Sequence, residues 1–249
     1  MQIKKGMFFI VSIFTLLLFS GCTTSTTKEM PVPETPSVDY TKAAKINAQL
    51  AIVYTQRGML DRAKEKLLKA ESQDDNIAQV FYAKGLYYQY LGLMDTAKDA
   101  FQKALYMASE DPQAYNFYAQ FLCGVQKDFS YANQLFQKAI VLRTNTKLAE
   151  TFSLYGQCLL LQGKTRQAKT AFLNAIKQSN NAPAAYWELA NIEYADKQYQ
   201  SALDFIDRYI QLEGKTKESL TLKMNILQKL GQDNKAATIR LQLSSKVYN

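Results

Sequence analysis

Histidine is absent from the 249 residues, and glycine, proline and cysteine are scarce. Without histidine the chain lacks the commonest general base and the commonest metal ligand. The 10 glycines and 5 prolines leave long stretches free of helix breakers, because three of the prolines (Pro31, Pro33 and Pro36) lie close together. The chain is 47% hydrophobic and long enough to bury a core, which favours an all-helical body.

Catalytic motifs are also missing. The serines have no histidine partner, no glycine-rich phosphate loop occurs, and the acidic pairs Asp74–Asp75 and Glu110–Asp111 fall in expected turns, where solvation accounts for them. The net charge of +8 is spread along the chain without a long basic run, so nucleic-acid binding is not expected. The sequence predicts no enzyme activity, cofactor, metal site or small-molecule substrate.

The N-terminus is typical of an export signal. Lys4 and Lys5 precede an apolar run over residues 7–19, which is too short to span a membrane comfortably. Phe19-Ser20-Gly21-Cys22 resembles the lipobox of bacterial lipoproteins, in which small residues precede the cysteine that is acylated. The resemblance implies a signal peptide over 1–21 and a fatty-acyl chain such as palmitate on Cys22; the alternative is an ordinary cleaved signal with an incidental cysteine.

Residues 22–42 are expected to form a flexible tether, since they are rich in Thr, Ser and Pro at their start and lack a core-forming pattern. In enterobacterial lipoproteins an Asp after the acylated cysteine favours retention in the inner membrane. Thr23 takes that place here. By this analogy the protein is expected in the outer membrane, lipid-anchored and facing the periplasm.

The remaining chain is periodic. Six alanines recur at intervals of 34–36 residues, namely Ala63, Ala97, Ala132, Ala168, Ala202 and Ala236. In five of the six cases a large apolar residue follows four positions later, as in Phe101 and Phe172, and a glycine such as Gly92 often precedes the alanine by five positions. Small residues let paired helices approach closely and large ones fill the space to the next pair, so stacking creates one core.

This pattern resembles the tetratricopeptide repeat, most closely in the second and fourth units. The matching residues of the second unit are Phe81, Gly85, Tyr88, Gly92, Ala97, Phe101 and Ala104. The resemblance implies an all-α superhelix of about six helix-turn-helix repeats over residues 43–249. Arg240 replaces the packing residue of the last unit, as expected of a terminal cap.

First-helix residues of such repeats line a concave groove. Counting in register, the residues expected there are mainly apolar or aromatic: Ile52, Tyr82, Leu86, Tyr90, Phe117, Phe121, Leu160, Leu161, Trp187 and Tyr194. An exposed surface of this kind suits an amphipathic helix or an apolar strand of a partner protein. The alternative is that several of these side chains belong to the core, because a register error of one residue would turn them inward.

Cys123 and Cys158 lie late in the first helices of neighbouring repeats. The periplasm permits a disulfide between them. Two buried thiols that pack as small apolar groups are the favoured interpretation, because a disulfide requires Cα atoms within about 7 Å.

The third unit carries a more specific signal. It contains Tyr115-Asn116-Phe117-Tyr118-Ala119-Gln120-Phe121-Leu122-Cys123. This segment resembles the Asn-Asn-aromatic-Gly-x-Phe-Leu-Cys stretch of the pilotin family of type IV pilus biogenesis lipoproteins, with Ala119 in place of its Gly. The resemblance implies that the partner is the pilus secretin, whose localisation and multimerisation the protein would support. The alternative function is a scaffold for cell-envelope enzymes or for outer-membrane protein assembly.

Overall fold

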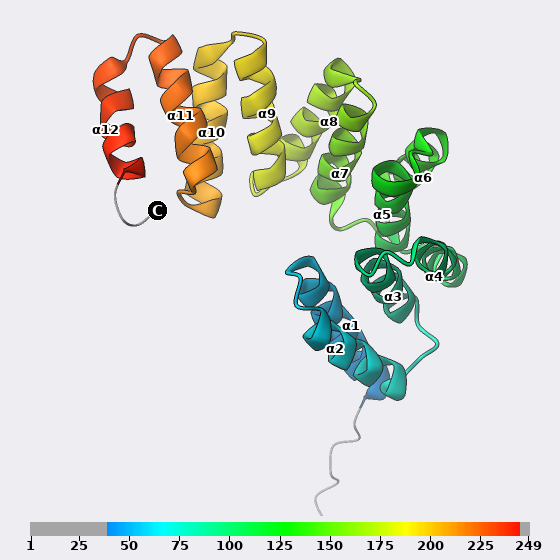
Figure 1. Cartoon of the computed structure of the whole chain (residues 1–249). Helices are drawn as coiled ribbons and strands as arrows, with labels where there is room; N and C mark the ends of the chain where they lie inside the picture. The colour runs from blue at the N-terminus through cyan, green and yellow to red at the C-terminus, as the bar shows by residue number, and fades with distance from the viewer. Residues whose placement is uncertain (1–38, 245–249) are drawn as a thin grey trace, which may run out of the picture. The chain divides into compact units, whose positions relative to one another are not determined.

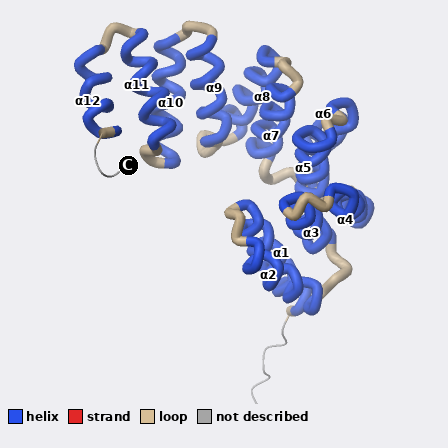
Figure 2. The backbone as a smooth tube through the Cα atoms, in the orientation of Figure 1, coloured by secondary structure: helices blue, strands red, loops and turns tan. Residues whose placement is uncertain are grey.

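The computed structural model of the protein describes residues 39–244, and this part of the chain is entirely helical, with no strand. The segment 1–21, Cys22 and most of the tether lie outside the described residues. Twelve α-helices form six antiparallel hairpins that follow one another in chain order (Figures 1 and 2), which confirms the predicted fold. The hairpins are α1 (Tyr40–Gln56) with α2 (Leu60–Gln73), α3 (Ala78–Tyr90) with α4 (Met94–Met107), α5 (Pro112–Phe121) with α6 (Phe129–Val141), α7 (Leu148–Leu161) with α8 (Thr165–Gln178), α9 (Pro183–Ala195) with α10 (Tyr199–Glu213), and α11 (Lys217–Lys229) with α12 (Asp233–Leu243).

The six repeated alanines all lie in second helices and are buried. The large apolar residues four positions later are buried as well, except that Arg240 of the last hairpin is exposed. Within each of the second and fourth hairpins a glycine of the first helix faces a phenylalanine of the second, Gly85 against Phe101 and Gly156 against Phe172. The small-and-large pattern of the sequence therefore sets the close packing inside each hairpin.

Each of the six turns has one residue with positive φ, five positions before the repeated alanine. Glycine takes this place in four hairpins, as at Gly92 with φ 78°. Lys127 and Lys197 take it in the third and fifth hairpins, with φ 58° and 62°. The left-handed turn is thus kept where the sequence lacks glycine, at a cost in backbone strain.

First helices of successive hairpins are in direct contact, from α1 with α3 to α7 with α9. Successive second helices make no comparable contact in the part of the chain that is described. The first helices therefore line the inner side of the stack, as in a superhelix, and the second helices line its outer side. None of the helices within residues 39–244 is long and apolar enough to cross a membrane.

The third hairpin departs from the others because α5 continues into a π-helix, η1 (Leu122–Gln126). This wider turn adds one residue between the body of the first helix and Ala132. The addition matches the interval of 35 residues from Ala97 to Ala132. Positions counted backward from Ala132 into α5 are consequently wrong by one residue.

Candidate protein-binding groove

One stripe of residues runs along the inner side of the first helices. Its members lie eleven residues before the repeated alanines, or twelve in the third hairpin, where η1 adds a residue. A small residue comes directly before the stripe in the first five hairpins (Ala51, Gly85, Ala119, Gly156 and Ala190), and all five are buried, which supports this register. The stripe residues are Ile52, Leu86, Gln120, Gln157, Asn191 and Asn225.

Two hollows adjoin on this inner side. The larger, of about 280 Å³, lies between α7 and α9, and the smaller, of about 150 Å³, lies between α5, η1 and α7. Leu154 and Gln157 line both. The groove is defined here by the residues that line the two hollows: Gln120, Cys123, Gly124, Phe136, Ala149, Glu150, Ser153, Leu154, Gln157, Cys158, Leu161, Asn181, Ala182, Pro183 and Ala184.

Four of the ten residues predicted for the groove are instead part of the core. Ile52, Tyr82 and Leu86 are 2%, 5% and 9% exposed, because α1, α3 and α5 pack directly against one another and bury the side chains between them. Phe121 is fully buried at 0%. The residue that η1 adds moves the stripe position from Phe121 to Gln120.

The other six predicted residues keep some exposed surface, and partner binding by them stays a prediction. Tyr90 and Leu161 are 47% and 56% exposed, but only Leu161 lines a hollow. The remaining four are partly buried, and three of them make ring contacts. The distances between ring centroids are 4.8 Å for Phe117 and Tyr82, 5.2 Å for Trp187 and Tyr209, and 5.7 Å for Tyr194 and Tyr199. The fourth, Leu160, packs against the core around Phe172.

Leu154 and Gln157, which join the two hollows, were not among the sequence-based candidates. Gln157 is polar, whereas the residues predicted for the groove are all apolar or aromatic, and Leu154 lies fourteen residues before Ala168, outside the predicted positions. The small residue before each stripe position was a signal that could have found the stripe, since Gly156 directly precedes Gln157.

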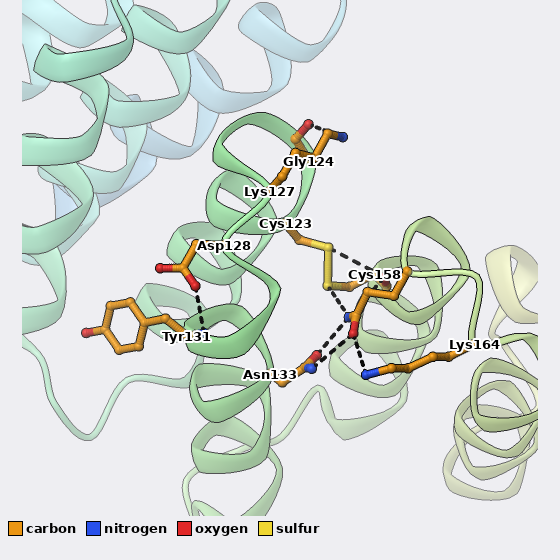
Figure 3. The surroundings of a disulfide bond; sticks show 9 residues. Cys123, Gly124, Lys127, Asp128, Tyr131, Asn133, Cys158 and Lys164 are labelled. Carbon is orange, nitrogen blue, oxygen red and sulfur yellow. Dashed lines mark hydrogen bonds between the residues drawn. A yellow bond between two sulfur atoms is a disulfide. The ribbon is translucent and has the colours of Figure 1, made fainter.

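A disulfide joins Cys123 of η1 to Cys158 of α7, with the Cα atoms 5.8 Å apart. The prediction of two free thiols was therefore wrong. The cysteines are 35 residues apart, one repeat, and η1 packs on α7, so the ends of two neighbouring first helices are brought together. Figure 3 shows the bond between the two cysteines with Asn133 close by. Beside it, Gln162 and Asn133 exchange hydrogen bonds of 3.0 and 3.2 Å through their side-chain amides. Both cysteines line the smaller hollow.

Carboxylates supply the charge near the groove. Glu150 is half exposed and 3.6 Å from Lys147, whereas Glu193 is buried with its carboxylate 2.6 Å from Lys169. Glu188 is partly buried and has no hydrogen bond or ion pair with any residue of 39–244, and burial raises the pKa of its carboxyl above the ordinary value of 4.5. Within residues 39–244 no three His, Cys, Asp or Glu side chains are grouped to hold a metal ion.

Comparison with known proteins agrees with this architecture. Two tetratricopeptide repeat models match, one over residues 78–111 and one over residues 156–215. Together with the six hairpins, these matches show that the fold is a tetratricopeptide-repeat superhelix.

A particular relative follows from the sequence. The type IV pilus assembly protein PilF of Pseudomonas aeruginosa strain PAO1 is 27% identical over 243 residues, which span 98% of this chain and 93% of PilF. The solved structure of P. aeruginosa PilF has a TM-score of 0.67 at 28% identity and covers 82% of this chain and 91% of that one. A solved structure of PilW, described as a widely conserved type IV pilus biogenesis factor, has a TM-score of 0.67 at 24% identity, covers 82% of this chain and 93% of that one, and supports the fold. The chain is a homologue of PilF, and the resemblance found in its sequence is confirmed.

Proposed function

We propose that this chain is an outer-membrane lipoprotein that acts as the pilotin of a type IV pilus, supporting the localisation and multimerisation of the pilus secretin. The observation that carries the proposal is the similarity to PilF along nearly the whole length of both chains. The groove on the inner side of the first helices supplies a place where a partner segment can bind. The function is that of an adaptor without catalysis.

The groove is suited to an apolar segment. Leu154 lies at its centre, Leu161 is 56% exposed beside the smaller hollow, and Ala149, Ala182 and Ala184 contribute to the walls of the larger one. Covering such surface releases about 25 cal/mol per Å² of apolar area. In this proposal the groove holds an apolar segment of a secretin subunit until that segment inserts into the membrane.

The anchor in this proposal is an acyl chain on Cys22, followed by the tether to the helical body. Several acyl chains bind a bilayer firmly, whereas a single chain binds only marginally. Metabolic labelling with an alkyne fatty acid and membrane fractionation test this part. We expect label and outer-membrane recovery in the wild type, and loss of both for Cys22→Ala; label that persists in the variant would show that Cys22 is not the acylated residue.

The secretin role is tested by deleting the gene and measuring secretin multimers in outer-membrane fractions. We expect monomeric or mislocalised secretin, restored by the wild-type gene. The double variant Leu154→Asp, Leu161→Asp should fail to restore multimers. Leu241→Asp on α12, a leucine that is 72% exposed and lies outside the groove, should restore them. Normal multimers in the deletion strain would contradict the proposal and leave the scaffold function of the sequence analysis as the alternative.

A further inference from the structure

Four successive positions of the stripe carry side-chain amides. Hairpins three to six contribute Gln120, Gln157, Asn191 and Asn225, and the last three are spaced by 34 residues, one repeat. Gln157, Asn191 and Asn225 are partly buried, and Gln120 is exposed. In hairpins one and two the same position holds Ile52 and Leu86, both buried in the contacts between first helices. The four residues are called the amide ladder below.

The amides have unused hydrogen-bonding groups. Gln120 donates from Nε2 to the main-chain carbonyl of Asn116 at 3.2 Å, and Asn191 donates from Nδ2 to the carbonyl of Trp187 at 2.9 Å. These bonds to the preceding turn fix the two side chains, and each side-chain carbonyl oxygen is left without a donor among the described residues. Each side-chain amide offers two donors and two acceptor lone pairs. Gln157 and Asn225 make no hydrogen bond with the part of the protein that the structure describes.

The spacing of the ladder matches an extended chain. Packed helices lie about 8–10 Å apart, and an extended strand rises about 3.3 Å per residue. One amide would therefore meet every third residue of a segment that crosses the first helices. Gln120, Gln157 and Asn191 lie on α5, α7 and α9, which pack against one another in turn, so this part of the ladder would span about seven residues. A helical segment presents no free main-chain groups along its length, because its N–H and C=O groups bond to each other.

We infer that the amide ladder binds the main chain of an extended partner segment that carries basic side chains between its apolar ones. Glu188 lies one position before Leu189 on α9 and takes the repeat position that Leu154 takes on α7, so it faces the same side as the groove. It has no cation within the described residues, in contrast to Glu193, which Lys169 neutralises. A Lys or Arg of the segment would pair with Glu188, and the apolar side chains would enter the hollows beside Leu154.

This inference rests on the proposed function only for the identity of the partner, since the ladder specifies the chemistry of the segment and not its source. The same positions would bind the secretin segment in an extended form rather than as a helix. Hydrogen bonds to the main chain give affinity without strong sequence preference, while the hollows and Glu188 select side chains.

A random twelve-residue peptide display library, selected on the purified protein, tests the inference without using secretin. The ladder variant Gln120→Met, Gln157→Met, Asn191→Leu, Asn225→Leu keeps side-chain size and removes the amides. Its matched control, Gln167→Met, Asn174→Leu, Gln178→Met, Asn234→Leu, changes four amides on the second helices α8 and α12. Circular dichroism melts first establish that both variants are folded.

We expect enriched peptides with alternating apolar and basic residues. Affinities should be lower by about 600-fold for the ladder variant, since it loses four amides and each net hydrogen bond is worth about fivefold. The control variant should bind as the wild type does. N-methylation of alternate peptide bonds should abolish binding, and Glu188→Gln should weaken it about tenfold.

The inference is overturned if no peptide distinguishes the wild type from the ladder variant, if acidic or helical peptides are selected, or if N-methylated peptides bind equally well. Such a result with secretin still dependent on the gene would leave the proposed function intact. If peptides bind specifically but gene deletion leaves secretin unaffected, the proposed function is rejected and the inference about the amide ladder stands.

Discussion

The main chain of Gly156 on α7 lies directly against the ring of Phe172 on α8. A Cβ atom placed on Gly156 would come within 2.5 Å of the ring, and Gly85 has the same relationship to Phe101 at 2.6 Å. Contacts this close leave no space for even one methyl group. The two pairs therefore set the distance between the first and second helices of their hairpins, and in the fourth hairpin they position Gln157, the residue shared by both hollows.

Gly156→Ala should destabilise the protein. Alanine gains about 1 kcal/mol over glycine in a helix, but forcing the ring of Phe172 aside costs about 3 kcal/mol, so we expect a net loss of about 2 kcal/mol in unfolding free energy. Chemical denaturation followed by circular dichroism measures the change. Gly124→Ala is the control, because a Cβ there meets nothing within 4 Å and φ is not positive; it should be neutral or slightly stabilising. Equal effects of the two substitutions would contradict the packing argument.

Lys197→Gly should stabilise the fifth turn. Lys197 has φ 62° where four other hairpins have glycine, and a non-glycine residue in this region costs about 1–2 kcal/mol. Glycine removes that cost but loses more entropy on folding, so a net gain of about 0.5 kcal/mol is expected. The reverse exchange, Gly163→Ala, should lose about 1 kcal/mol at the equivalent turn. The midpoint of urea unfolding reports both, and a lower midpoint for Lys197→Gly would show that its side chain stabilises the turn.

Most of the fold could be predicted from the repeated alanines of the sequence. A small residue such as Ala97 lets the two helices of a hairpin approach closely, and a large one such as Phe101 fills the space to the next hairpin. Every hairpin needs both, so the pattern recurs with each hairpin. The number and order of the hairpins therefore followed from spacing alone. The left-handed conformation of Lys127, five residues before Ala132, was not predicted, because a lysine side chain does not favour it.

The groove was less predictable, for two physical reasons. The residue that η1 adds is accommodated by widening one turn. Near Phe121 only Ala119, the small residue directly before Gln120, marks the change of register. Apolar character also did not separate groove residues from core residues. Ile52 and Leu86 occupy the same position of the stripe as Gln157 and Asn225, but the direct packing of α1, α3 and α5 buries the first two, whereas the last two stay partly exposed. How closely neighbouring first helices approach depends on the whole stack.

Reduction of the disulfide should loosen the middle of the stack. The bond between Cys123 and Cys158 closes a loop with a sequence separation of 35, and the chain-entropy model assigns such a loop about 3–4 kcal/mol. We expect Cys123→Ser, Cys158→Ser to lose up to about 3 kcal/mol and to increase hydrogen exchange most in η1 and α7. Mass spectrometry of the alkylated protein, with and without reductant, checks the bond itself. A wild type that alkylates at both cysteines without reductant would exclude the disulfide.

Glu188 should make stability depend on pH. Burial raises the pKa of its carboxyl above the ordinary value of 4.5. At a pH between 4.5 and this raised pKa, the folded protein therefore binds more protons than the unfolded chain. Stability from this group therefore falls as the pH rises through that interval, and the whole cost of the buried charge is present at pH 7. Glu188→Gln removes the charge and should raise the unfolding free energy at pH 7, with no gain below about pH 4, where the carboxyl is already neutral.

Urea unfolding of the wild type and of Glu188→Gln, measured at intervals from pH 3.5 to pH 8, gives this difference directly. Glu150→Gln is the matched control on the same face, because its carboxylate is half exposed and near Lys147, where solvent screening keeps the contribution of an ion pair to stability small. A group retained at a cost to stability is expected where a partner's cation neutralises it on binding. If Glu188→Gln is no more stable than the wild type at pH 7, the carboxylate is already compensated in the free protein, and its pairing with a basic partner residue loses its physical basis.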